Sequence, residues 1–503
     1  MISKGLLIHK LPLAIIVIGS VARLNQYFYN RSLWSDEAAL ALNIVNRSYA
    51  ELLEPLDYNQ GAPIVFLLIQ KFAVQLLGNN EYALRLIPLI SGIIALFLIC
   101  RLAKLWLLPK SIPLAMLLAV GLRQIIYFST EVKQYSSDVA ISLLSFFLAY
   151  QLVKSKLTLN QAVLLAAVGG VLVWCSHPAI FVLASVGFVS IVIGQYKHKH
   201  AHSIKLSILV LSAWLVSFAA FYLISLQTLG DNQDLVTSWQ NVKRAFPSSP
   251  FDLLWVLDGL GRFFYKPLGF KGPWDGVAII AFLAGCISLY RRQKLKLLIL
   301  LSPVLTTLGA AYLHKYPFEG RLLLFLTPFF IILIAEGMSF VLEISPNRWA
   351  KFLSILLVIA IVLVPLEGVG RALTMPRWHD EIKPVMNYVK ANQKPDDKLH
   401  VYRKGTEQFL YYAERYGYQE GDYVLGVEAI DGDNGRSELN PVQWEQYKQQ
   451  LNTLQGHDRV WFLFAHAWIN RENKLIKEYL DQIGTQLDSF ESYESFVYLY
   501  DLS

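Results

Sequence analysis

Charged residues are scarce in this sequence, and the scarcity is uneven along the chain. Asp, Glu, Lys and Arg make up 17% of the 503 residues, whereas soluble domains carry about 25%. Long apolar runs fill most of Leu11–Val369, while Arg371–Ser503 has the composition of a soluble protein. The shift predicts a membrane-spanning domain of residues 1–370 and a soluble domain of residues 371–503.

Cysteine is equally scarce, and its positions exclude a disulfide scaffold. Cys100, Cys175 and Cys286 all lie inside apolar runs, where cysteine behaves as a small buried hydrophobe. The soluble part contains none, so no disulfide framework can hold it. The N-terminus has no small-residue cleavage site and is interpreted as an uncleaved first span.

The apolar runs predict about 11 transmembrane helices, because a spanning helix needs about 20 apolar residues. The expected spans begin at Leu11, Ala83, Ile112, Ser136, Leu159, Ala179, Leu206, Gly276, Leu297, Leu322 and Phe352. A further apolar segment, Pro63–Leu77, is short and interrupted by Gln70, Lys71 and Gln75.

The basic residues indicate where Pro63–Leu77 lies. If this segment does not cross, every strongly basic short loop falls on the cytoplasmic side, as the positive-inside rule expects. These clusters are Lys4/Lys10, Arg101/Lys104/Lys110, Lys154/Lys156, Lys197/Lys199/Lys205, Arg291/Arg292/Lys294/Lys296 and Arg348/Lys351. We therefore expect an amphipathic helix in the outer interface.

The same argument predicts a cytoplasmic N-terminus and an extracytoplasmic C-terminal domain, in a bacterial inner or plasma membrane. The net charge of +7 belongs to these orienting loops. It does not indicate a nucleic-acid partner.

Two adjacent carboxylates, Asp36 and Glu37, follow the first span beside Trp34. At a membrane surface, partial desolvation makes a carboxylate a better base. The same residues could instead begin a helix, with Ser35 as its cap and both acids at the positive end of the helix dipole. Both readings can hold at once.

Three other connections carry polar residues that could bind a substrate. Tyr58 and Gln60 precede a turn and a helix start at Pro63, which structure alone could explain. A short outer connection carries Glu131, Lys133 and Tyr135 at membrane depth, where ionisable groups suggest function. A surface pair of Glu131 and Lys133 without a role is the alternative.

The connection His314–Arg321 brings His314, Lys315 and Arg321 near the membrane surface. Such cations suit a phosphate head group, and ordinary interfacial anchoring is the alternative.

The soluble part reads as a small α/β domain. Strands are expected at Lys398–Arg403, Arg459–Phe464 and Ser495–Tyr500, and helices at Thr406–Tyr416 and Asn473–Ile483. No glycine-rich phosphate loop precedes these helices, so we expect a binding or covering role. His400, Tyr411, Tyr412 and His466 are interpreted as packing residues. Asp431–Gly435 is interpreted as a plain turn, because it lacks EF-hand spacing.

Several segments together resemble the superfamily of dolichyl-phosphate-mannose/protein mannosyltransferases and aminoarabinose transferases, of the C-type glycosyltransferase fold. They are Asp36-Glu37, Gln60-Gly-Ala-Pro63, Leu84-Arg85-Leu-Ile-Pro88, Tyr135 in Ser-Thr-Glu-Val-Lys-Gln-Tyr, and Phe-Glu-Gly-Arg321, in the family's order across Leu11–Leu342. The resemblance implies interfacial helices in the first outer loop. It also implies Asp36 as catalytic base with Glu37 as its neighbour, and a second acidic residue that maps best to Glu131.

The implied reaction moves a sugar from a polyprenyl-phosphate donor to a hydroxyl of a protein, lipid or glycan. Polyprenyl phosphate leaves as a stable anion, so one base suffices, and a single displacement inverts the anomeric centre. The residues expected to bind substrate are Tyr58, Gln60, Arg85, Lys133, Tyr135, Lys315 and Arg321.

Some family members bind a metal at a His or Glu two residues before a Pro-Pro pair, but this chain has Gln60 and Ala62-Pro63. A neutral amide is a poor transition-metal ligand, so no cofactor is assigned, and a divalent metal is left open as the alternative. The alternative functions are a transporter or flippase of lipid-linked glycans and a non-catalytic scaffold that binds lipid heads. Transporters often contain repeated halves, and no such repeat is evident in the sequence.

Overall fold

The computed structural model describes residues 10–153, 157–198, 201–227, 244–376, 379–427, 441–467 and 471–503. They form two compact units. The membrane unit comprises Met1–Tyr29, Tyr49–Pro55 and Gly61–Arg377, and the soluble unit comprises Asn30–Ser48, Leu56–Gln60 and Trp378–Ser503. Two pieces of the first predicted outer loop therefore belong to the soluble unit, while the sequence boundary after residue 370 stays a prediction.

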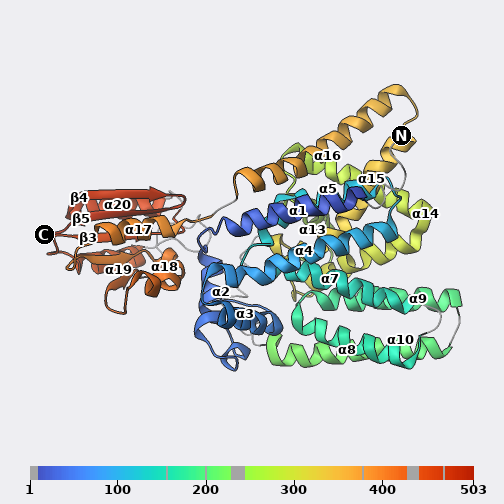
Figure 1. The fold of residues 1–503 in the computed structure, drawn as a ribbon, viewed down its shortest axis with the longest axis horizontal. Helices are drawn as coiled ribbons and strands as arrows, with labels where there is room; N and C mark the ends of the chain where they lie inside the picture. Colours follow the sequence, from blue (N-terminus) through green and yellow to red (C-terminus); the bar gives the residue numbers. More distant parts are fainter. Residues whose placement is uncertain are drawn as a thin grey trace. The chain divides into compact units, whose positions relative to one another are not determined.

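The long helices of the membrane unit run roughly parallel to one another (Figure 1). The α-helices are α1 (Leu11–Phe28), α3 (Ile64–Leu77), α4 (Glu81–Trp106), α5 (Ile112–Gly121), α6 (Arg123–Phe128), α7 (Tyr135–Tyr150), α8 (Leu159–Cys175), α9 (Ala179–His198), α10 (Ala201–Phe221), α13 (Leu253–Tyr265), α14 (Pro273–Tyr312), α15 (Thr327–Ile344) and α16 (Arg348–Thr374). Short helical turns are η2 (Glu51–Leu53), η3 (Gln151–Val153), η4 (Tyr222–Leu226) and η5 (Gly320–Leu326).

In the described residues, seven helices are long and apolar enough to cross a membrane, and four shorter apolar helices accompany them. The chain is thus a multi-pass membrane protein, but the expected number of 11 spans is not confirmed. Two expected spans lie in α14, which consists of two helices that meet across a kink at Gln293, where the backbone is non-helical (φ −154°, ψ 66°). The span expected from Ile112 is divided into α5 and α6.

The interfacial segment is helical as predicted, since α3 is a helix of 14 residues. Its place at a membrane surface and the orientation of the termini stay predictions. Several residues of the charge argument lie outside the described ranges, as does the predicted turn Asp431–Gly435. These residues are Lys4, Lys154, Lys156, Lys199 and part of the loop Leu229–Asp275.

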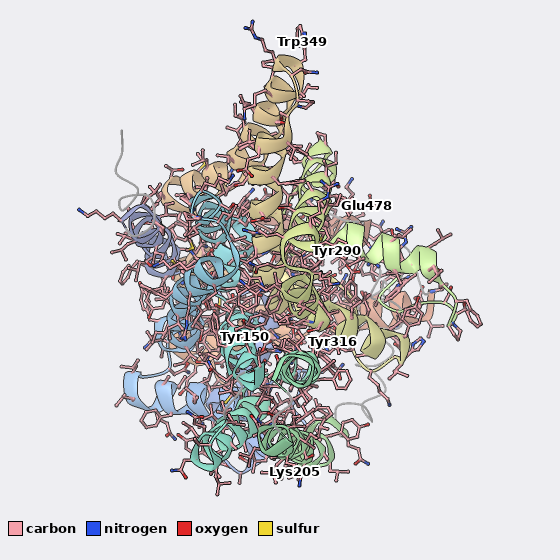
Figure 2. All side chains as sticks on the ribbon, turned by 90° about the vertical axis from the view of Figure 1, so that its right-hand side faces the viewer. Tyr150, Lys205, Tyr290, Tyr316, Trp349 and Glu478 are labelled. Carbon is pink, nitrogen blue, oxygen red and sulfur yellow. The ribbon has the colours of Figure 1, made fainter. Side chains whose placement is uncertain are left out.

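Helix α15 is the centre of the membrane unit, because every residue from Thr327 to Ser339 is buried. Gly337 of α15 faces Ala281 of α14 so closely that any Cβ at this position would overlap the Ala281 carbonyl. Small residues allow such close helix packing in membranes. Helix α16 is peripheral, and its first turns, with Trp349 78% exposed, extend beyond the neighbouring helices (Figure 2).

The soluble unit combines one five-stranded sheet with helices. Its elements are α2 (Ser35–Asn46), α17 (Ile382–Asn392), β1 (Lys398–Val401), η6 (Arg403–Gly405), α18 (Thr406–Ala413), η7 (Glu414–Tyr416), β2 (Tyr423–Leu425), α19 (Pro441–Asn452), β3 (Val460–Phe464), α20 (Arg471–Ile483), β4 (Thr485–Ser492) and β5 (Ser495–Asp501). The strand order is β2-β1-β3-β5-β4. This confirms the predicted small α/β domain.

The sheet is mixed, with β1 parallel to β2 and β3, and β5 antiparallel to β3 and β4. Every residue of β3 is buried, as expected of a central strand covered on both faces. Phe462 of β3 packs with Tyr447 of α19 and Leu480 of α20 in the core. This core fixes the ends of β3 and the β4–β5 turn, from which the side chains discussed below extend.

Candidate functional site

The adjacent acids Asp36 and Glu37 lie in the first turn of α2. The helix reading of the sequence is confirmed, but Ser35 is not its cap. Ser35 is the first helical residue, and Trp34 takes the cap position in extended backbone without a side-chain cap hydrogen bond. Both carboxylates therefore stand at the positive end of the helix dipole, which favours negative charge.

Glu37 is held in a buried ion pair. Its Oε1 accepts a hydrogen bond from Arg31 Nη2 at 3.2 Å, and the two side chains are 0% and 1% exposed. A buried charge is tolerated when it is paired, and removal of one partner is costly. Glu37 therefore stabilises the fold through this ion pair, whether or not it also takes part in catalysis.

Asp36 has a more open environment than Glu37. Its side chain is half-buried, and its Oδ1 accepts a hydrogen bond from Gln60 Nε2 at 3.3 Å. The Gln60 amide also donates to the Tyr58 carbonyl at 3.0 Å. Tyr58 and Asn59 both have left-handed backbone (φ 59° and 52°), which turns the chain so that Gln60 reaches α2. The structure thus brings Asp36, Gln60 and Tyr58 together, as the sequence motifs suggested.

The segment Asn30–Trp34, called the strap below, is fastened to the C-terminal part of the soluble unit. The backbone N–H and hydroxyl of Ser32 donate to Glu381, the hydroxyl at 2.7 Å. The Leu33 N–H donates to Tyr412 Oη at 2.9 Å, and Gln408 Nε2 donates to the Leu33 carbonyl at 3.0 Å. Because α2 begins directly after the strap, these contacts also locate Asp36.

The second predicted outer connection, residues 129–134 between α6 and α7, is built differently. Glu131 and Lys133 are 0% and 4% exposed, so the predicted surface pair is wrong. The segment is folded by local bonds, from Thr130 N–H to the Tyr127 carbonyl at 3.0 Å and from Lys133 N–H to the Glu131 carbonyl at 2.7 Å. Gln134 Nε2 also donates to the Gly61 carbonyl at 3.3 Å.

Arg321 lies against Tyr135, with its guanidinium carbon 5.5 Å from the ring centroid. Tyr316, which the sequence did not single out, donates from its hydroxyl to the Leu322 carbonyl at 2.8 Å. Asp138 is buried and accepts a 2.6 Å hydrogen bond from the Ser176 hydroxyl. Two of the predicted substrate-binding residues, Tyr135 and Arg321, are therefore in contact.

The three cations expected from the connection His314–Arg321 have separate surroundings. His314 stacks on Phe246 with ring centroids 5.0 Å apart, while Lys315 is exposed. Within the described ranges, the Lys315 side chain makes no ion pair, whereas Arg321 lies on Tyr135. Arg85 is 2% exposed in the first turns of α4, so it is a buried cation of the membrane unit.

Comparison with solved structures identifies proteins of similar fold. No protein-family model and no curated protein matches the sequence. The archaeal oligosaccharyltransferase AglB of Archaeoglobus fulgidus, in complex with an inhibitory peptide and a dolichol-phosphate, superposes with a TM-score of 0.50 and 11% identity, over 98% of this chain and 74% of that one. ArnT of Cupriavidus metallidurans bound to undecaprenyl phosphate superposes with a TM-score of 0.52 and 10% identity, over 96% and 97%. The chain has the C-type glycosyltransferase fold.

The fold confirms the resemblance suggested by the ordered motifs. At such low identity it establishes the architecture, and the roles of individual residues stay predictions.

The residues near Asp36 do not form a typical metal site. In the part of the chain that the structure describes, no group of three or more His, Cys, Asp or Glu side chains is arranged to hold a metal ion. Asp36 accepts a hydrogen bond from the neutral amide of Gln60, a group that transition metals seldom select. We therefore assign no step to a metal.

Sequence reasoning missed the residues that hold the site in place. Arg31, Glu381 and Tyr412 contact the strap or α2, and Tyr412 had been interpreted as packing. Arg31 stands six residues before Glu37, so its basic charge was a usable local signal. For Glu381 and Tyr412 no local signal exists, because their partners lie about 350 residues earlier in the sequence.

Proposed function

We propose that this protein is an integral membrane glycosyltransferase that moves a sugar from a polyprenyl-phosphate donor to an acceptor hydroxyl on the extracytoplasmic face. The shared C-type glycosyltransferase fold over nearly the whole chain supports this proposal. Both solved structures were obtained with a polyprenyl-type lipid phosphate, dolichol-phosphate in one and undecaprenyl phosphate in the other. A lipid-linked donor is therefore the natural class of substrate for this chain.

The contrast between the two adjacent carboxylates supports Asp36 as the base. Glu37 is buried and paired with Arg31, whereas the side chain of Asp36 is half-buried and accepts a hydrogen bond from the Gln60 amide. A general base must be able to reach the proton that it removes. Asp36 meets that condition better than its neighbour.

The reaction then proceeds in one displacement. Asp36 takes the proton from the acceptor hydroxyl, and the acceptor oxygen forms a bond to the anomeric carbon. The bond from that carbon to the phosphate oxygen breaks with its electron pair on the phosphate. The donor leaves as polyprenyl phosphate, and the anomeric centre is inverted.

Cations of the membrane unit would bind the donor phosphate. Lys133 and Arg321 are the candidates, with exposed Lys315 and buried Arg85 as further ones. Glu131 remains the candidate for the second carboxylate. Arginine and lysine provide charge-assisted hydrogen bonds to phosphate oxygens.

Substitution of Asp36 by Asn tests the proposal in the full-length protein reconstituted with lipid-linked sugar donors. The variant keeps the size and the Gln60 contact but cannot accept a proton, so transfer falls by about 10²- to 10⁴-fold while donor binding is retained. Asp57→Asn is the matched control, since Asp57 lies in the same loop, is 62% exposed and pairs with Arg47.

Full transfer by Asp36→Asn excludes Asp36 as the base. Lipid translocation without any sugar transfer in the wild type instead identifies a flippase.

A further inference from the structure

Three acid–base side chains meet beside the strap. Asp380 lies just before α17, His466 follows β3, and Glu494 lies in the two-residue turn between β4 and β5. His466 Nδ1 is 2.6 Å from Asp380 Oδ2, and the Asp380 side chain is 1% exposed. The group therefore joins three separate elements of the soluble unit around one buried carboxylate.

Two carboxyl groups belong to this cluster. Among the described residues, Asp380 Oδ1 and Glu494 Oε2 are buried and have no conventional donor. Two neighbouring carboxyl groups avoid mutual repulsion when one of them carries a proton. Burial, with the hydrogen bond and charge of Asp380, raises the pKa of Glu494 to about 7.

His466 supplies the positive charge of the group. Burial opposes the imidazolium, but the hydrogen bond and charge of Asp380 outweigh it and raise the pKa of His466 above its ordinary value. The same contact lowers the pKa of Asp380 against the effect of its own burial. The imidazolium of His466 and the carboxylate of Asp380 therefore stabilise each other at this contact.

His466 also has left-handed backbone, with φ at 53°. For a residue with a side chain this backbone conformation is strained and persists only when surrounding contacts impose it. The Ala467 N–H donates to the Glu494 carbonyl at 3.2 Å, so the β4–β5 turn itself holds this loop. The left-handed backbone at His466 directs the imidazole toward Asp380.

Trp34, the last residue of the strap, packs against this group. The Trp34 ring centroid lies 6.2 Å from that of His466 and 5.4 Å from that of His379. Asp36 follows two residues later, in the first turn of α2. Trp34 thus contacts the acid–base group through its ring and stands two residues before the proposed catalytic base.

The other charged groups around His466 are few. Lys404 of η6 lowers the pKa of His466 by charge repulsion, and its own ammonium is paired with Glu472 of α20 at 2.9 Å. On the strap side, Glu381 accepts from Ser32, and Lys383 Nζ donates to the Asn30 carbonyl at 2.7 Å. His379 faces Trp34 from the same segment as Asp380.

We infer that Asp380, His466 and Glu494 form a proton-operated latch that holds the strap closed and thereby positions Asp36. The three are positioning residues, and the inference rests on the proposed function only where it concerns the rate of transfer. The latch itself is a property of the soluble unit and exists whatever the reaction.

The latch weakens as pH rises. Glu494 has a raised pKa, so its favourable state is the protonated one, and ionisation above about pH 7 adds a second negative charge beside Asp380. His466 also has a raised pKa, so its contribution is present at low pH and is lost as the imidazolium deprotonates. Both changes act in the same direction, and the strap opens on the alkaline side.

Hydrogen–deuterium exchange of the full-length protein at pH 6 to 9, corrected for intrinsic rates, measures the latch directly. The reporters are the Ser32 and Leu33 amides, which donate to Glu381 and Tyr412. We expect their protection in the wild type to fall roughly tenfold or more across this range, the equivalent of one pKa unit. The rate of sugar transfer is measured over the same range.

Two substitutions separate the members of the latch. Glu494→Gln imitates the protonated carboxyl, so the alkaline decline of strap protection and of transfer becomes shallower than in the wild type and is left to His466 alone. His466→Gln removes the cation, so protection is low at every pH. His457→Gln is the control, because His457 precedes the same strand at its other end and its ring nitrogen lies 3.1 Å from the Leu454 carbonyl; it keeps the wild-type profile.

Each outcome decides the matter. Wild-type pH dependence of strap protection in Glu494→Gln overturns the latch, even if His466→Gln fails to fold. A pH-dependent strap in a protein that transfers no sugar supports the latch and refutes the proposed function. If the rate of transfer depends on pH while strap protection stays constant, the latch is overturned and the proposed function stands.

Discussion

The strap leads directly into Asp36 and the second outer connection carries Glu131, and these two segments are held by different means. The strap depends on partners far along the chain, since Ser32 and Glu381 are 349 positions apart. The backbone bonds of residues 129–134 join residues two or three apart, and one side-chain bond, from Gln134 to the Gly61 carbonyl, reaches farther. Asp36 can therefore be moved by changes in the C-terminal part of the soluble unit, while Glu131 depends on its own turn and on contacts within the membrane unit.

Removal of Arg31 tests the strap side with the largest expected effect. Arg31→Met leaves the Glu37 charge buried without its cation, which lowers the free energy of unfolding by about 3–5 kcal/mol. Hydrogen exchange of α2 measures the loss, and peptides covering residues 129–134 keep their protection.

The double variant Arg31→Met/Glu37→Met sharpens this result, because apolar replacement of a whole buried pair is often nearly neutral. A stable double variant with full transfer shows that Glu37 is only structural. A stable but inactive one shows that Glu37 takes part in catalysis. Unchanged protection in Arg31→Met would contradict the buried pair.

Enlargement of Gly92 tests the other region, with an intermediate effect. A Cβ at this position in α4 would lie 2.5 Å from Ser129 Cβ and 3.0 Å from Ser136 Oγ. Gly92→Ala should destabilise the membrane unit by about 1–3 kcal/mol through overpacking and reduce transfer, with strap exchange unaffected.

Gly309→Ala is the control for Gly92→Ala, because nothing lies within 4 Å of a Cβ there. It should be neutral or slightly stabilising. If Gly92→Ala loosens the strap as much as residues 129–134, the two regions are not independent.

Loss of the Tyr412 hydroxyl gives the smallest change. Tyr412→Phe removes the acceptor of the Leu33 N–H, which costs about 1 kcal/mol of local stability and should raise exchange at Leu33 alone. Tyr411→Phe is the control, since its hydroxyl accepts from Arg415 at 2.6 Å. Equal exchange at Leu33 in both variants would show that this hydrogen bond does not hold the strap.

The same contrast explains how much the sequence could predict. Apolar runs located the membrane helices, because burial and length act locally, and ordered motifs identified the fold. Within α14, basic residues on both sides of Gln293 suggested a connection between two spans, and two helices do meet there, across a kink at a single non-helical residue. Strand β4 was missed because it is a largely exposed edge strand with polar alternation.

At the candidate site, the sequence could indicate the acids but not their surroundings. Asp36 and Glu37 look equivalent in sequence, and only the Arg31 pair distinguishes them. His466 was interpreted as a packing residue, since nothing near it in sequence announces Asp380, 86 residues earlier. Long-range pairings leave no periodic signal.

The strap also sets a condition on how the chain is made. Its binding groups on α17 and α18 are synthesised about 350 residues later, which at 5–20 residues per second is a delay of roughly 20 to 70 s. During that interval the strap has been synthesised, but its partners Glu381 and Tyr412 have not. These hydrogen bonds of the strap can therefore form only when the last quarter of the protein has been made.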